Sequence, residues 1–143
     1  MKIAILTSCA ALFAVAISTA GSASAEELTF PDKCKSEMAM SGDMMKGHDM
    51  SGMNMQEMPD HQKEAMEGMK SMDMNMMQGM MKKDPDVAFN CGMIAHHMGA
   101  ISMAETELKH GKDKVSKERA QQIIDAQKKE IKEMSAWVEK EVK

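Results

Sequence analysis

The sequence predicts an all-α fold, a small antiparallel bundle of three to four helices preceded by a flexible methionine-rich arm. Apolar residues recur three and four positions apart in three successive segments, as on amphipathic helices. No segment shows the strict alternation that is typical of strands. Short turns rich in Pro, Asp and Gly separate the three segments, which favours antiparallel neighbours.

The first 25 residues have the layout of an export signal. Lys2 precedes an apolar run, which ends in a stretch of small residues with Ala23 and Ala25 in the A-x-A pattern. We therefore expect cleavage after Ala25 and a periplasmic location. No later segment is apolar enough to span a bilayer, so no membrane insertion is expected after cleavage.

Residues 26–58 are predicted to form the flexible arm. Sixteen of the chain's 21 methionines lie between Met38 and Met81. The first half of that region is interrupted by glycines and polar residues and has no large aromatic residue to anchor a core. The helical domain is predicted to follow, over residues 59–143.

Turn signals divide this domain into helices. Pro59 suits the start of the first helix, and Asp84 with Pro85 suits the N-cap and first position of the second. Gly111 is expected to end the second helix after His110. A third helix is predicted from about Ser116 to near the C-terminus. The predicted methionine face of the first helix consists of Met66, Met69, Met76, Met77 and Met80.

The second helix carries two adjacent histidines. Its predicted central stripe comprises Phe89, Met93, Ala100 and Ala104. At about 100° per residue, His96 and His97 lie on either side of Met93. In the third helix the predicted seam is Ala120, Ile124, Gln127, Ile131, Met134 and Val138.

Charge and cysteine content narrow the choice of partners. The net charge of −4 argues against nucleic acid and anionic membrane surfaces. Cys34 and Cys91 would remain after export, where a pair of cysteines often forms a disulfide. Two thiolate metal ligands are the alternative, and the sequence leaves both open.

Methionine sulfur is a neutral, polarisable donor that binds Cu(I) without losing a proton. In the arm, M-x-M and M-x-x-M spacings recur, with a histidine at their start. The arm's candidate metal ligands are His48, Met50, Met53, Met55 and Met58.

In the second helix, Met93 lies one turn from both His96 and His97, and Met103 lies two turns from His96. These side chains are candidate metal ligands. Ordinary core packing of the methionines is the alternative, with the histidines hydrogen-bonded to partners such as Glu107 or Gln127.

The first helix adds peripheral metal candidates, namely His61, Met66 and Met69. His110 is better explained by the dipole at its helix C-terminus. No nucleophile and base pair, phosphate loop or H-E-x-x-H motif is present, so no enzymatic activity is predicted. A di-iron site needs several Glu-x-x-His pairs, and only Glu107 precedes a histidine by three residues.

The stretch DPDVAFNCGMIAHHMGAISMAETEL resembles the helical core of the CopM-like periplasmic copper-binding proteins, a family filed as domain of unknown function 305. The resemblance extends over roughly residues 59–138. It implies a ferritin-like bundle, binding of Cu(I) and also Ag(I) or Cu(II), and a role in copper resistance or delivery. By position it implies these ligand candidates: Met93, His96, His97, Met103 and Met134.

The sequence therefore predicts a periplasmic copper metallochaperone or buffer that prefers Cu(I). Its expected partners are the metal ion and a periplasmic copper efflux or oxidase protein. Two alternatives remain: a methionine-rich interaction module that needs no metal, and an oxidant sink that cycles through methionine sulfoxide.

Overall fold

The computed structural model describes residues 28–36 and 57–143. This part contains a 3-10 helix η1 (Asp32–Cys34) and three α-helices, α1 (Asp60–Met80), α2 (Pro85–His110) and α3 (Lys114–Glu141), with no strand. The prediction of an all-α bundle is confirmed. The predicted signal peptide and most of the predicted arm, with His48, Met50, Met53 and Met55, lie outside the described residues.

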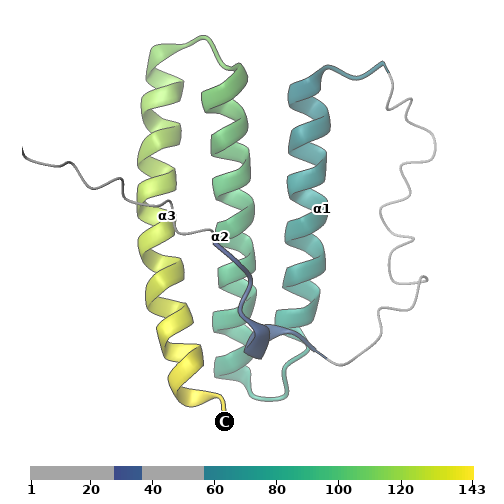
Figure 1. Cartoon of the computed structure of the whole chain (residues 1–143), viewed down its shortest axis with the longest axis vertical. Coiled ribbons are helices and arrows are strands. Elements are labelled where there is room, and N and C mark those ends of the chain that lie inside the picture. The colour runs from purple at the N-terminus through teal and green to yellow at the C-terminus, as the bar shows by residue number, and fades with distance from the viewer. Residues whose placement is uncertain (1–27, 37–56) are drawn as a thin grey trace, which may run out of the picture.

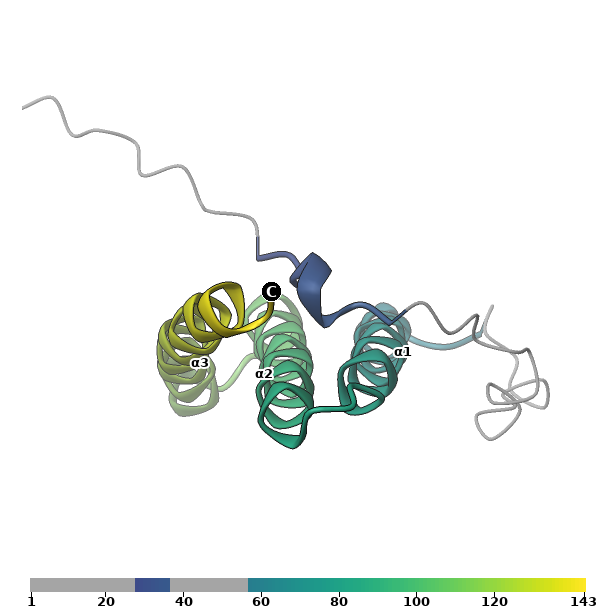
Figure 2. The same ribbon diagram turned by 90° about the horizontal axis from the view of Figure 1, so that it is seen from below.

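The three α-helices run antiparallel to their neighbours and lie side by side, with α2 in the middle (Figures 1 and 2). Helix α2 packs along both α1 and α3, whereas α1 and α3 make no comparable contact with each other in the described part. The bundle is therefore a single layer of helices, in which α2 has two packed sides. No helix in this part is both long and apolar enough to cross a bilayer.

Helix boundaries follow from capping. The Asp84 carboxylate accepts hydrogen bonds from the backbone N–H groups of Asp86 (2.9 Å) and Val87 (3.0 Å), and Pro85 occupies the first helical position. Helix α3 begins at Lys114, two residues before the expected start, because Asp113 caps it by accepting from the Ser116 N–H (2.7 Å). That hydrogen bond lowers the pKa of the Asp113 carboxyl.

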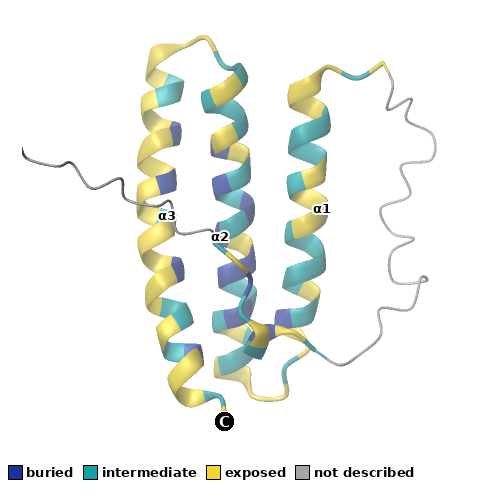
Figure 3. Cartoon of the chain, in the orientation of Figure 1, coloured by how far each residue is buried: buried dark blue, intermediate teal, exposed yellow. Residues whose placement is uncertain are grey.

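The buried residues show where the core lies (Figure 3). Four seam positions of α3 are buried as predicted, namely Ala120, Ile124, Ile131 and Val138. On α2 the buried residues are Cys91, Ile94, Ala95, His97, Gly99, Ile101 and Ala104.

The predicted central stripe of α2 is wrong except at Ala104. Phe89 is 64% exposed, and Met93 and Ala100 are only partly buried. The prediction assumed that one stripe of α2 faces one core. Because α2 buries two opposite sides against two neighbours, the predicted stripe falls between them.

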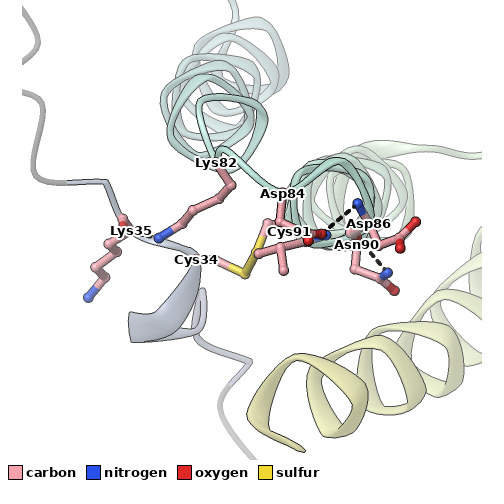
Figure 4. Close-up of a disulfide and its surroundings, with 8 residues drawn as sticks. Cys34, Lys35, Lys82, Asp84, Asp86, Asn90 and Cys91 are labelled. Carbon is pink, nitrogen blue, oxygen red and sulfur yellow. Dashed lines mark hydrogen bonds between the residues drawn. A yellow bond between two sulfur atoms is a disulfide. The ribbon is translucent and has the colours of Figure 1, made fainter. Parts of the chain in front are cut away.

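Residues 28–36 form a strap on one face of the layer, near one end (Figures 1 and 2). Cys34 of η1 is joined to Cys91 of α2 by a disulfide with a Cα–Cα distance of 5.3 Å (Figure 4). Lys33 Nζ donates to the backbone carbonyls of Glu139 (2.6 Å) and Val142 (2.7 Å), at the end of α3. The sequence left open a disulfide or two thiolate metal ligands, and the structure shows the disulfide.

The disulfide lies beside a close approach of α1 and α2. A Cβ placed on Gly79 would lie 2.7 Å from the Cys91 carbonyl carbon and 2.8 Å from the Gly92 nitrogen. Only glycine leaves room for α2 backbone at this distance. This contact fixes the end of α1 against the first turns of α2.

Candidate functional site

A groove of about 430 Å³ runs between α1 and α2. Its lining residues are Met76, Met80, Ala88, Phe89, Gly92, Met93 and His96. Three of these carry thioether sulfurs and one carries an imidazole. The groove therefore gathers four side chains with donor atoms suited to a soft metal, from two different helices. We call this surface the Met–His groove.

Helix geometry explains why these four side chains share one groove. Met76 and Met80 are one turn apart on α1, and Met93 and His96 are one turn apart on α2. The turn between the helices is short, so the end of α1 lies beside the beginning of α2.

Glycines on α2 make room for the methionines of α1. A Cβ on Gly92 would meet the Met80 side chain at 3.4 Å, and a Cβ on Gly99 would overlap the Met72 side chain. Two methionines of α1, Met72 and Met80, thus lie against small residues of α2. The predicted methionine face is not buried as a whole, because three of its five methionines are exposed. This arrangement sets the register of the two helices and leaves the Met–His groove open between them.

The groove is accessible from solvent. Met80 is 60% exposed and His96 is exposed, whereas Met76 and Met93 are partly buried. An ion in the groove could therefore exchange ligands at its outer side while the inner sulfurs hold it.

His97 has different surroundings from His96. It is buried, and its Nε2 is hydrogen-bonded to Glu130 Oε2 on α3. Its Nδ1 is also buried and has no hydrogen-bond partner within the described residues. The partner is Glu130, and not Glu107 or Gln127, the two partners suggested by the sequence. The structure thus places His97 at the α2–α3 contact, outside the Met–His groove.

Two other candidate ligands also lie apart from the groove. Met103 is 55% exposed and lines a second hollow, of about 330 Å³, between α2 and α3. This hollow also contains Glu107, Arg119 and Ile123. Met134 is partly buried against the core on α3. The structure does not bring either methionine into the Met–His groove.

His61, the candidate ligand at the start of α1, lies in a separate polar cluster. The His61 ring lies 6.1 Å from the ring of His110. Glu64 accepts hydrogen bonds from Lys109 and from His110 Nε2 (3.1 Å), and these contacts, that of Lys109 first, lower the pKa of its carboxyl. His110, which the sequence assigned to the helix dipole, therefore binds a carboxylate as well.

The remaining candidates are scattered around α1. Met58 precedes the helix and is partly buried, Met66 is partly buried, and Met69 is 48% exposed. None of the three lines the Met–His groove. Among the residues that the structure describes, no group of three or more His, Cys, Asp and Glu side chains could hold a metal ion.

Comparison with known protein families decides where the chain belongs. The sequence profile described as Domain of unknown function (DUF305) matches residues 14–138. The chain belongs to the DUF305 family. A comparison with curated proteins finds no match.

The DUF305 match includes α1, α2 and all but the last three residues of α3, and hence the whole Met–His groove. Sequence reasoning identified Met76 and Met80 as part of a helix face but missed them as candidate ligands. The signal that could have found them is the short turn at residues 81–84. In an antiparallel pair, such a turn sets the last methionines of α1 beside Met93 and His96.

Proposed function

We propose that this DUF305 protein is a periplasmic copper-binding protein that carries or buffers Cu(I). The observation that carries the proposal is the convergence of Met76, Met80, Met93 and His96 on one groove. Three thioethers and one imidazole form a donor set for a soft monovalent ion, and Ag(I) has similar preferences. Binding of Cu(II) at this site would depend more on the His96 imidazole than on the thioethers.

The chemistry of these donors suits an oxidising compartment. Both described cysteines are paired in a disulfide, so they are not free to serve as thiolates. Thioethers need no deprotonation to bind a metal, so their affinity for Cu(I) should depend little on pH. Export through residues 1–25 is the second part of the proposal and rests on the sequence alone.

Access to the groove favours transfer over permanent storage. The outer donors, Met80 and His96, are exposed, and an acceptor's ligands could replace them one at a time. The proposed acceptor is a copper efflux or oxidase protein. The predicted arm ligands, His48, Met50, Met53, Met55 and Met58, would add capacity close to the chain's helical domain.

The test is an anaerobic Cu(I) titration of chain 26–143 against a chromogenic chelator. Met76→Leu/Met80→Leu removes two groove sulfurs while nearly conserving volume, so the helices should stay folded. The matched control is Met77→Leu/Met81→Leu, two exposed methionines from the same end of α1 that do not line the groove.

In all proteins of this comparison every methionine of residues 38–58 is replaced by leucine and His48→Ala is added, so that arm ligands do not mask the groove. We expect the groove variant either to lose one tightly bound equivalent of Cu(I) or to bind it at least about tenfold more weakly. A tenfold loss corresponds to about 1.4 kcal/mol of binding free energy. The control should bind as the parent does. Equal binding by both variants would refute the groove as the copper site.

A second function is favoured by the exposure of Phe89 at the groove's edge. An interaction module would use Phe89 and the flexible methionines to hold an apolar partner, with no metal. In that case the Met76→Leu/Met80→Leu variant would keep its function, because leucine preserves the apolar surface.

A further inference from the structure

We propose that a second copy of this chain covers the open face of the helix layer, with the two α2 helices crossing antiparallel near His96. The open face is defined by Phe89, Met93, His96, Ala100 and Met103 of α2 and by the hollows on either side of them. The dimer itself does not depend on copper binding. Its strengthening by copper, described below, rests on the proposed function.

The five α2 residues fall in one narrow sector because their spacings of three and four keep them on one side of the helix. Cys91, two residues from Phe89, points to the other side, where the strap is attached. One side of the layer is therefore partly covered by the strap, and the other carries exposed apolar side chains. Phe89 is 64% exposed, Met80 60% and Met103 55%.

A layer of helices normally buries such a face against a second layer. A cluster of exposed large apolar residues along one face is typical of an interaction surface. The helices of the described part leave this face without a second layer (Figure 2).

The shape of the face favours its own copy as the partner. Phe89 projects at one end, and the hollow at the other end has a floor of small residues, Ala100, Ala104 and Ala120. Phe89 and Ala104 are fifteen residues apart on α2, or about 22 Å. When two copies cross antiparallel near His96, each Phe89 faces the partner's hollow. Such an interface is isologous and closes on itself.

Charge repulsion disfavours a parallel arrangement. Glu107 and Arg119 line the hollow at one end of the face. At the other end, Asp86 is exposed less than one turn from Phe89, and Lys83 is exposed just before α2 begins. A parallel pairing would set Glu107 against its own copy. The antiparallel pairing separates the two Glu107 carboxylates by roughly 33 Å. It brings Asp86 to the level of the other copy's Glu107, where Lys83 and Arg119 supply one positive charge on each side.

This crossing brings the two His96 imidazoles close to the two-fold axis, each with Met93 one turn away. A Cu(I) ion near the axis could then take ligands from both copies. Under the proposed function, copper should therefore tighten the dimer, because the ion binds the paired state better than the single chain.

The first test measures mass by sedimentation equilibrium on chain 26–143, first without metal and then with anaerobic Cu(I). Ile123→Glu places a charge in the hollow and should weaken the metal-free dimer by at least about 100-fold. Val115→Glu is the matched control, since Val115 is an apolar residue of α3 that is 59% exposed and lies outside both hollows. Circular dichroism verifies that both variants fold.

Cross-linking tests the crossing point. In metal-free protein, His96→Cys should form a disulfide between copies, because the two positions lie near the axis. Met103→Cys should not form one. Position 103 is seven residues from His96, or about 10 Å from the axis along the helix, so the two cysteines would be about 20 Å apart. Cross-linking at Met103→Cys as efficient as at His96→Cys would refute the antiparallel crossing.

The outcomes separate this inference from the proposed function. A dimer that Ile123→Glu weakens and Val115→Glu leaves intact supports the inference, even if no copper binds. A protein that binds Cu(I) but keeps the mass of one chain refutes the dimer and leaves the copper proposal standing. A dimer that Ile123→Glu does not affect would also refute the inference, because its interface would lie elsewhere.

Discussion

His96 and His97 are adjacent in sequence but face different helices. Their ring centroids are 6.0 Å apart. His96 is exposed and lines the groove shared with α1, whereas His97 is buried and hydrogen-bonded to Glu130 of α3. Consecutive helical residues differ by about 100° in direction, which is enough to separate them between the two sides of α2. The two imidazoles therefore have different expected roles.

Substitution of each histidine should separate those roles. His97→Ala leaves a cavity and removes the link to Glu130, so we expect a loss of about 2–3 kcal/mol in the free energy of unfolding. His96→Ala should change that free energy by less than about 0.5 kcal/mol, because the side chain is exposed. Urea unfolding measures both values. Anaerobic Cu(I) titration should show weakened binding for His96→Ala and nearly unchanged binding for His97→Ala. The reverse pattern would contradict the assignment.

The disulfide should stabilise the fold, because it ties the strap to α2 across a sequence separation of 57 residues. Reduction, or Cys34→Ser/Cys91→Ser, should lower the free energy of unfolding by about 2–4 kcal/mol. Chemical denaturation with and without a reductant measures this difference. The serine variant is its own control, since the reductant should not change its stability. Equal stability of oxidised and reduced wild type would show that the strap contributes little.

Glycines 79 and 92 should respond in opposite ways to alanine. Gly79→Ala places a methyl group against rigid α2 backbone and should cost about 1–3 kcal/mol. Gly92→Ala meets only a flexible Met80 side chain at 3.4 Å. Because alanine favours helix, this variant should be neutral or more stable by up to about 1 kcal/mol. Thermal unfolding followed by circular dichroism compares the two; a tolerated Gly79→Ala would contradict the close approach of α1 and α2.

The Glu64 cluster should contribute a pH dependence in acid. Lys109 and His110 hold the pKa of the Glu64 carboxyl below its usual value of 4.5. A carboxyl with a lowered folded-state pKa stabilises the protein above the unfolded-state pKa, and this contribution is lost as pH falls through the folded-state pKa. Glu64→Gln should therefore reduce stability at neutral pH and flatten the decline below about pH 4.5. Unfolding at a series of pH values measures this, with Glu67→Gln, an exposed neighbour, as the control.

Local signals predicted the fold well, and tertiary arrangement explains what they missed. The Asp84 cap, the Pro85 start and the end of α2 at His110 are all present, because they depend on neighbouring residues. Which side of α2 is buried depends on having two partner helices, and this led to the wrong placement of Phe89. Glu130 as the partner of His97 depends on the register of α3 against α2, which no local pattern contains.

The candidate site shows the same division. The periodic methionines of α1 were visible in the sequence, but their convergence with Met93 and His96 required the antiparallel pairing of α1 and α2. The sequence instead grouped Met93 with both histidines, whereas the structure places only His96 with it in the groove. A ligand set drawn from two helices cannot be read from spacing along one.

The most direct test is copper K-edge X-ray absorption on chain 26–143 with every methionine of residues 38–58 replaced by leucine and His48→Ala added. The protein is loaded with one equivalent of Cu(I) under anaerobic conditions. We predict a shell of sulfur scatterers with a nitrogen contribution, from Met76, Met80, Met93 and His96. The sulfur contribution should fall in Met76→Leu/Met80→Leu and remain in Met77→Leu/Met81→Leu. A shell of nitrogen and oxygen alone, or a sulfur shell unchanged in the groove variant, would contradict copper binding in the Met–His groove.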